Sequence, residues 1–337
     1  MSEFDDARLD SDDARRDQGL EFLASAGARI RREALFEPHG PVEAFARPRG
    51  VIAIGAEARL IRAVLEPVCP APFVAWPAEG LPGWVGSLDL VIVLGSQGSD
   101  LAMLNSAREA VRRGASLLVA APDGSELAEV TASRGTLLVP TTSGDPTAAA
   151  VAVLAILHRM GLGPLVVPDH VADAADAVAQ ACSPMADASQ NPAKALAMSM
   201  ADDLPLIWGG TVLAARASRR IAEAIREASG RAALALDADD LYQLLGRTDR
   251  RDVFADPFDD SARDRVPMLV VCEDKLSPAV VAHTQIDLSS MASELGLRAH
   301  LISAGDSDAP GTEMDRYLTL LQHGLYGAAY LRLGLGG

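Results

Sequence analysis

Short apolar runs that alternate with helical patterns constrain the fold of this chain more than any other feature of its sequence. Runs rich in Val, Leu and Ile, most clearly 88–94 and 266–272, are each followed by a segment whose apolar residues recur at helical spacing. Strands that are apolar throughout and alternate with amphipathic helices are typical of a parallel sheet covered by helices on both faces. The sequence therefore predicts an α/β fold built from three-layer α/β/α sandwiches.

The alternation occurs twice along the chain. Strands are expected in the first half at 51–55, 73–76, 88–94, 116–120 and 136–139, and in the second half at 205–208, 232–236, 266–272 and 299–302. Helices are expected at 19–35, 56–65, 101–113, 148–160, 169–181, 211–229, 283–295 and 313–331. Because 49–76 parallels 203–236 and 88–120 parallels 266–302, we expect two units of one topology.

The same patterns suggest where one domain ends and the next begins. The predicted parts are an N-terminal helical segment (1–45), a first α/β domain (46–160), a proline-rich connection (161–200) and a second α/β domain with a closing helix (201–337). At roughly 100–200 residues per domain, a chain of 337 residues agrees with two domains.

Charge and cysteine content exclude several classes of protein. The net charge of −16 does not suit binding to nucleic acid or to an anionic membrane. Cys69, Cys182 and Cys272 form no CxxC or Cys/His cluster, so we expect no metal site and a reducing cytoplasm. We also expect no cofactor. The longest apolar stretch, 148–157, is far short of the ~20 residues that span a bilayer. The Asp-rich stretch 256–264 is expected to be a solvated loop.

The best candidate for a binding site is the loop Gly95-Ser96-Gln97-Gly98-Ser99. It joins an apolar strand to the start of a helix, where backbone N–H groups are unpaired and the helix dipole is positive. Its serine hydroxyls add donors, so the loop suits a phosphate group. It lacks the GxxxxGK[ST] pattern of a nucleotide P-loop, and the turn at Gly55 lacks a dinucleotide fingerprint. The alternative is that Ser99 or Asp100 only caps the helix.

Several of these features together resemble a sugar isomerase (SIS) domain. In the first half, these features are the order of elements, Ile-Gly at 54–55 and the serine-rich loop before helix 101–113. The second half extends the resemblance with Leu-Ile-Trp-Gly-Gly at 206–210 and with the helix that ends at 226–230. The two halves resemble the bifunctional phosphoglucose/phosphomannose isomerase family, in its divergent actinobacterial branch, over about 19–333. The resemblance implies two tandem SIS (flavodoxin-like) domains that bind a sugar phosphate and interconvert aldose and ketose through an enediolate.

The resemblance also implies roles for particular residues. The substrate phosphate would be held by the loop residues Gly95, Ser96, Gly98 and Ser99, beside the first turn at Gly55. Glu227 would be the catalytic base that moves the proton, and its alternative role is that of a solvated helix residue. Further candidates for lining the cleft are Gly209, Gly210, His283 and His323.

Three groups that the resembled family uses are missing from this chain. Where the ring-opening histidine is expected, 239–243 reads Asp-Asp-Leu-Tyr-Gln; no arginine is present in 141–145, and no lysine in 333–337. Each loss would remove on the order of 10²–10⁴ in rate. We therefore expect weak or absent isomerase turnover. The alternative function is a non-catalytic SIS-domain sensor of a sugar phosphate, or a regulatory partner.

The closing helix bears on assembly. It carries more apolar and aromatic residues than packing on one sheet requires, namely Tyr317, Leu320, Leu321, Leu325, Tyr326, Tyr330 and Leu331. Protein interfaces favour tyrosine, and the resembled family forms dimers whose cleft borrows residues across the interface. A homodimer is therefore expected, in which a histidine from the other subunit, such as His283 or His323, would partly replace the missing one. The alternative is that the helix is wholly internal.

Overall fold

The chain folds into two compact units in this computed structural model, which describes residues 3–40, 42, 45–249, 266–305 and 311–337. The first unit comprises residues 26–173, and the second unit comprises residues 1–25 together with 174–337. The stretch 256–264, expected to be a solvated loop, lies outside the described residues.

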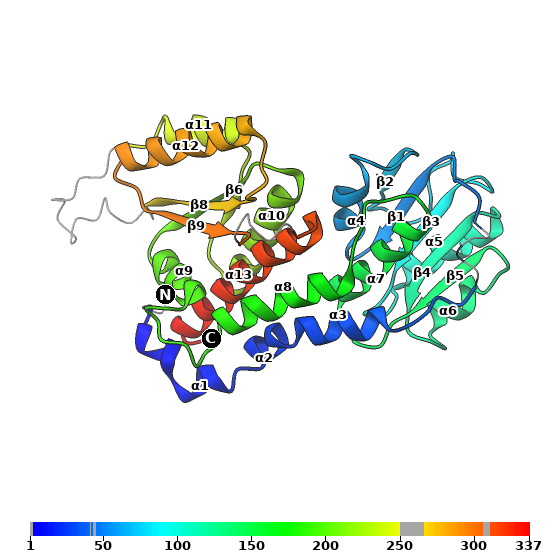
Figure 1. The fold of residues 1–337 in the computed structure, drawn as a ribbon, viewed down its shortest axis with the longest axis horizontal. Coiled ribbons are helices and arrows are strands. Elements are labelled where there is room, and N and C mark those ends of the chain that lie inside the picture. The colour runs from blue at the N-terminus through cyan, green and yellow to red at the C-terminus, as the bar shows by residue number, and fades with distance from the viewer. Residues whose placement is uncertain (1–2, 41, 43–44, 250–265, 306–310) are drawn as a thin grey trace. The chain divides into compact units, whose positions relative to one another are not determined.

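The first unit contains a five-stranded sheet in which all neighbouring strands are parallel (Figure 1). Its strands are β1 (Val51–Gly55), β2 (Phe73–Ala75), β3 (Leu90–Leu94), β4 (Ser116–Ala121) and β5 (Thr136–Pro140). Their order, β2-β1-β3-β4-β5, is the flavodoxin-like one. β1, β3 and β4 are buried along nearly their whole length, which explains why they read as continuous apolar runs.

Helices cover both faces of this sheet. They are α3 (Ala26–Ala34), α4 (Ala58–Leu65), α5 (Leu101–Arg112), α6 (Glu126–Thr131) and α7 (Pro146–Arg159). α4 and α7 pack on one face, with α3 against α7, while α5 and α6 pack together on the other (Figure 1). A buried cluster that includes Val91, Leu117 and Leu104 fills the space between the sheet and α5.

The second unit contains a four-stranded parallel sheet. Its strands are β6 (Leu204–Gly209), β7 (Leu234–Ala235), β8 (Pro267–Glu273) and β9 (Ala299–Ser303), in the order β7-β6-β8-β9. Its helices are η1 (Asp6–Asp10), α1 (Asp12–Arg15), α2 (Gln18–Ala24), α9 (Pro192–Met200), α10 (Val212–Ser229), α11 (Ala238–Leu245), α12 (Ala279–Glu294) and α13 (Glu313–Gly334), while α8 (Pro168–Ala181) contains the boundary between the units. α10 and α13 pack together, and α11 packs with α12 over the opposite face of the sheet (Figure 1).

The doubled α/β fold predicted from the sequence is confirmed. β6, β7, β8 and β9 repeat the order of β1, β2, β3 and β4, and among the residues that the structure describes only the first unit adds a fifth strand. The short helices α6, α9 and α11 were not predicted. The expected helix 19–35 is wrong at its centre, because Ser25 ends α2 and donates its hydroxyl to the carbonyl groups of Glu21 and Phe22.

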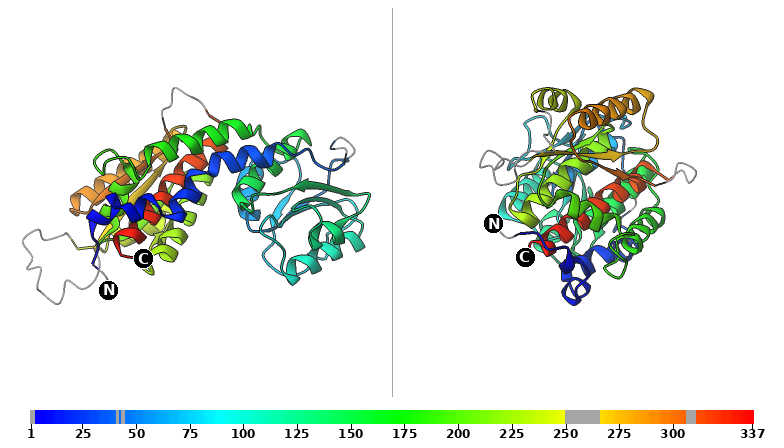
Figure 2. Two further views of the ribbon diagram at one scale, coloured as in Figure 1. Left: turned by 90° about the horizontal axis from the view of Figure 1, so that it is seen from below. Right: turned by 90° about the vertical axis from the view of Figure 1, so that its left-hand side faces the viewer.

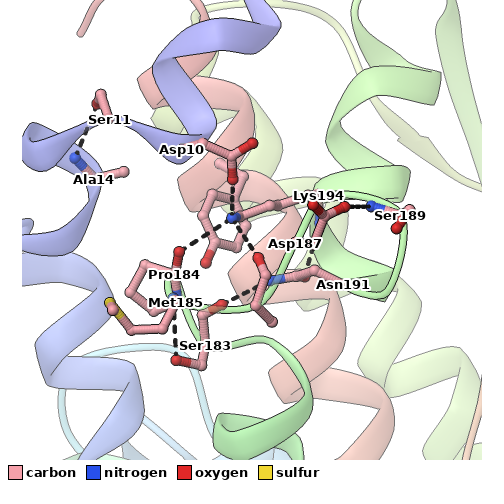
Figure 3. Close-up of polar contacts among 12 residues, drawn as sticks. Asp10, Ser11, Ala14, Ser183, Pro184, Met185, Asp187, Ser189, Asn191 and Lys194 are labelled. Carbon is pink, nitrogen blue, oxygen red and sulfur yellow. Dashed lines mark hydrogen bonds and ion pairs between the residues drawn. The ribbon is translucent and has the colours of Figure 1, made fainter.

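A buried lysine joins the N-terminal segment to the rest of the second unit (Figure 3). The Lys194 ammonium donates to Asp10 Oδ1 at 2.6 Å and to the carbonyl oxygens of Pro184 at 3.2 Å and Ala186 at 2.8 Å. It also lies 5.5 Å from the centre of the Tyr330 ring. Because a buried ammonium is costly unless all its donors are satisfied, these contacts fix η1 against the segment that precedes α9.

Most apolar side chains of the closing helix α13 are buried within the second unit. Tyr317, Tyr326 and Tyr330 are each at most 1% exposed within the single chain. α13 packs against α9, α10, η1 and α2, and Figure 2 shows the N-terminal helices beside it. The interpretation that its apolar residues face a partner subunit is therefore wrong for these side chains. Within the described residues, no helix is long and apolar enough to cross a membrane.

Candidate functional site

The carboxyl ends of β1 and β3 form the point in the first sheet where the strand order reverses. In open α/β sheets, ligands bind in the crevice at such a point. Gly55 ends β1 opposite Leu94, with φ of +107°, and a Cβ at this position would lie 2.3 Å from the Leu94 carbonyl oxygen. Only glycine permits this approach. The structure thus places the turn at Gly55 beside the start of the predicted loop.

The loop 95–99 follows β3 directly and leads into α5. Ser96 is 5% exposed and Ser99 is half-buried. Within the described part of the chain, neither serine hydroxyl has a hydrogen-bond partner, and the backbone N–H groups of Ser96, Gln97 and Ser99 have none either. The loop therefore presents unpaired donors at the crevice, as an anion site requires.

Helix capping does not consume these serines. The N-cap of α5 is Asp100, whose carboxylate accepts a hydrogen bond from the Met103 backbone N–H at 2.7 Å. The capping alternative is therefore correct for Asp100 and not for Ser99. Both hydroxyls remain available for a ligand, although the Asp100 carboxylate adds a negative charge nearby.

A second loop of the first unit, 141–145 after β5, is already occupied by the chain's own carboxylates. Glu33 on α3 is fully buried and accepts hydrogen bonds from the backbone N–H groups of Thr142 and Ser143. Arg29, one turn earlier, pairs with Asp145 at 2.7 Å. An arginine thus reaches this loop from α3, although the loop itself has none. The helical spacing of Arg29 and Glu33 was the only sequence signal for this cluster.

The corresponding reversal point of the second sheet lies between β6 and β8, and side chains bridge it. Asp274 follows β8, is 9% exposed, and accepts hydrogen bonds from Thr211 Oγ1 at 3.2 Å and from Arg316 Nε at 2.7 Å. Thr211 follows β6, and Arg316 lies in the first turn of α13. A carboxylate of the chain therefore occupies the place where the first unit presents unpaired hydroxyls.

A cavity of about 360 Å³ lies beside this bridge, where β6 and β7 end. The predicted cleft residues Gly209 and Gly210 line it, together with Trp208, Thr211, Val212, Ala215, Ser218, Arg219, Ala235, Leu236, Asp237, Ala238, Val281 and Thr284. Arg219 is exposed and, among the described residues, makes no ion pair or hydrogen bond. Neither Arg219 nor Asp237 was predicted as a site residue. Signals for both were present in the sequence, because Arg219 lies in the helix expected after Gly209 and Gly210, and Asp237 follows the strand expected at 232–236.

The structure does not bring Glu227 or the two histidines to this cavity. Glu227 is exposed near the C-terminal end of α10 and lies about 12 Å, at 1.5 Å per residue, beyond Arg219, the last residue of that helix in the cavity lining. His283 is exposed on α12 and does not line the cavity. His323 on α13 is near His300 on β9, and burial lowers the pKa of both imidazoles. No group of three or more metal-binding side chains was found within the described ranges.

No protein-family model matches the sequence, and no curated protein matches it closely enough to count as a relative. Solved structures of sugar-phosphate enzymes do share its fold. A glucose-6-phosphate isomerase-like protein from Thermus thermophilus matches over 97% of this chain and 93% of its own, with a TM-score of 0.53 and 18% identity. Tagatose-6-phosphate ketose/aldose isomerase from Escherichia coli matches over 95% and 89%, with a TM-score of 0.63 and 13% identity.

A third similar structure is the C-terminal domain of glucosamine-fructose-6-phosphate aminotransferase from Francisella tularensis. It matches over 96% of this chain and 97% of its own, with a TM-score of 0.63 and 11% identity. At these identities the likeness establishes the fold alone. The chain therefore has the two-sheet α/β fold found in SIS-type phosphosugar isomerases.

Proposed function

We propose that this chain binds a sugar phosphate, with the phosphate group on the loop of Gly95, Ser96, Gly98 and Ser99 and beside Gly55. The observation that carries the proposal is the set of unpaired hydroxyl and N–H donors of Ser96 and Ser99 at the reversal point of the first sheet. The fold shared with phosphosugar isomerases supports it. The specific substrates we propose are glucose 6-phosphate and mannose 6-phosphate.

Isomerisation of such a sugar moves a proton between C1 and C2, which requires a positioned base and a group that stabilises the enediolate oxygen. Glu227 is our proposed base. Its exposure, and its distance along α10 from the residues after β6, favour slow turnover. The same observations support the alternative function, a non-catalytic sensor or regulatory partner that uses only the phosphate loop.

Binding is tested by thermal unfolding with and without glucose 6-phosphate. A ligand that binds only the folded state at a hundred times its Kd stabilises that state by about 2.7 kcal/mol, so the Tm should rise. Ser96→Ala with Ser99→Ala should abolish the rise. Ser289→Ala with Ser290→Ala, a double change on α12, is the matched control and should retain it. An unchanged rise in the loop variant would exclude the loop as the phosphate site.

Catalysis is tested by coupled turnover of fructose 6-phosphate and mannose 6-phosphate. We expect weak or absent turnover from the purified protein, because the ring-opening histidine and the terminal lysine are missing. If turnover occurs, Glu227→Gln should abolish it, while Glu223→Gln, an exposed carboxylate one turn earlier, should not. Full activity in Glu227→Gln would assign the proton transfer to another residue.

We also propose a homodimer in the cytoplasm. The three free cysteines support a reducing compartment. The dimer now rests on the resemblance alone, because the apolar residues of α13 are buried within one chain. Light scattering at micromolar concentration measures it directly. A mass near 35.3 kDa, that of one chain, would refute the dimer and any histidine shared between subunits.

A further inference from the structure

The cavity of the second unit has the features of a binding site that the proposed function does not use. It lies outside the carboxyl ends of β6 and β7, and its lining combines two charged side chains, Arg219 and Asp237, with apolar ones. We propose that it binds a nucleoside 5′-monophosphate, with the phosphate at the start of α10 and the ribose at Asp237. This site is separate in the sequence from the sugar-phosphate loop.

The phosphate end of the cavity is formed by one face of α10. Thr211 caps the helix through the Ala214 N–H, and the N–H groups of Val212 and Leu213 have no partner among the residues described. Thr211, Ala215, Ser218 and Arg219 recur at helical spacing and all line the cavity. Helical side chains tilt toward the N-terminus, so the unpaired Arg219 guanidinium can supplement the helix dipole in binding a phosphate.

The ribose end is formed by the turn after β7. Asp237 caps α11 with one carboxylate oxygen, which accepts a hydrogen bond from the Asp240 N–H at 2.9 Å. Its other oxygen has no partner within the described residues. A carboxylate at the end of the strand that neighbours a glycine turn is where nucleotide-binding βαβ units receive the ribose hydroxyls. Asp237 has that place relative to Gly209 and Gly210.

Gly209 allows α10 to begin close to the end of β6, beside the cavity. A Cβ on Gly209 would lie 2.3 Å from the Ala214 carbonyl carbon, so a larger residue would push the helix away from the strand. The close packing brings the start of α10 to the end of β6. Val212, whose N–H group is unpaired among the described residues, is therefore part of the cavity lining.

The apolar part of the lining distinguishes a nucleotide from a sugar phosphate. It includes Leu236 and Val281, together with the edge of Trp208, which is 4% exposed. A hexose phosphate is polar around its whole ring and would leave hydroxyls unpaired against such surface, which is costly. A nucleobase is planar and largely apolar on its faces, and it packs well against aromatic and aliphatic side chains. The volume of about 360 Å³ lies within the usual range for small-molecule pockets.

Isothermal titration calorimetry with adenosine 5′-monophosphate (AMP) tests the proposal. The full chain should bind AMP saturably and more tightly than adenosine or inorganic phosphate. Arg219→Ala should weaken AMP binding about tenfold to a hundredfold, since it removes a charge-assisted contact. Arg59→Ala, an exposed helical arginine of the first unit that makes no contact among the described residues, is the matched control and should bind as the parent does.

The ribose contact is tested by a change in preference rather than in affinity alone. The parent should prefer AMP to 2′-deoxy-AMP, and Asp237→Asn should reduce that preference while still capping α11. No saturable AMP binding, binding unaffected by Arg219→Ala, or equal binding of the deoxy compound would overturn the proposal. Glucose 6-phosphate that displaces AMP would overturn it too, by assigning the cavity to sugar phosphates.

The two proposed sites can fail independently. Ser96→Ala with Ser99→Ala should leave AMP binding unchanged, and Arg219→Ala should leave the glucose 6-phosphate shift in Tm unchanged. Loss of AMP binding in the serine variant would place the nucleotide on the loop of the first unit and overturn the assignment to the second. Loss of only the sugar-phosphate response would test the proposed function and leave the nucleotide site standing.

Discussion

The two sheets share one strand order but differ in what lies at their reversal points. In the first unit, the loop after β3 presents the unpaired hydroxyls of Ser96 and Ser99. In the second unit, the equivalent loop after β8 contributes Asp274, which is bound by Thr211 and Arg316. The loop after β3 thus leaves its donors for an external anion, while the carboxylate after β8 binds the donors of Thr211 and Arg316.

The difference teaches that topology determines where a site can form and loop chemistry determines whether it does. On the β8 side of the second sheet, Thr211 and Arg316 already bind the carboxylate of Asp274. The available cavity lies instead on the β7 side, at Gly209 and Asp237. If the units arose from one ancestral form, their sites would now suit different ligands.

The largest effect that would sharpen this comparison is expected from Asp274→Ala. The side chains of Asp274 and Arg316 are 10% and 13% exposed, so the change leaves a largely buried guanidinium without its partner. We expect the free energy of unfolding to fall by about 3–5 kcal/mol. Asp100→Ala, which removes only a helix cap in the first unit, should cost about 1 kcal/mol. Urea denaturation measures both.

A double variant separates the ion pair from general damage. Arg316→Ala combined with Asp274→Ala should cost less than the sum of the two single changes, because neither charge is then left unpaired. Equal costs for Asp274→Ala and Asp100→Ala would contradict the view that the carboxylate after β8 stabilises its unit more than the helix cap after β3 stabilises its own.

The parts of the fold that sequence predicted are those that local pattern determines. Buried strands such as β3 and β8 read as continuous apolar runs, and helices such as α5 and α10 showed apolar residues at helical spacing. The short helices α9 and α11 were missed because their stability comes from packing and from caps at Asn191 and Asp237, which single positions in a sequence signal weakly.

The candidate site was predictable only where one segment supplies it. The loop 95–99 is contiguous, so its serines could be identified as donors. Asp274 and Arg316 are 42 residues apart, and Glu33 reaches Thr142 across 109 residues. Such pairs depend on tertiary packing, which no local spacing encodes. The surplus apolar residues of α13 were misjudged for the same reason, because the helices that cover them, α9, η1 and α2, are distant in sequence.

The next largest expected effect is a difference in how the stability of the two units depends on pH. Burial lowers the pKa of His300 and of His323 below the usual 6.5 in the second unit. Since the unfolded chain binds these protons more readily, the folded state should lose stability as the pH falls through about 6.5, and not above it. His323→Gln should therefore reduce the loss in unfolding free energy between about pH 7.5 and about pH 5.5, measured in urea.

The matched control for this prediction lies in the first unit. His158 is exposed, and His158→Gln should leave the pH dependence of stability as it is in the parent. Hydrogen exchange localises the effect: amides of β9 and α13 should lose protection at the lower pH before those of β3 and β4. A His323→Gln variant with the same pH dependence as the parent would show that other groups cause the acid sensitivity.

The last prediction concerns the reactivity of the cysteine thiols, which should differ between the two units. It involves no expected change in stability. Burial raises the pKa of Cys182 and of Cys272, both in the second unit, to about 12. At about pH 8 their thiolate fraction is on the order of 10⁻⁴, and the thiolate is the reactive form. Cys69, in the first unit, is partly exposed.

Iodoacetamide should therefore add one label to the native chain, at Cys69, and three labels in urea, as counted by mass spectrometry. Cys69→Ser should leave the native chain unlabelled, and rapid native labelling of Cys272 would show that the sheet of the second unit opens far more readily than its burial implies.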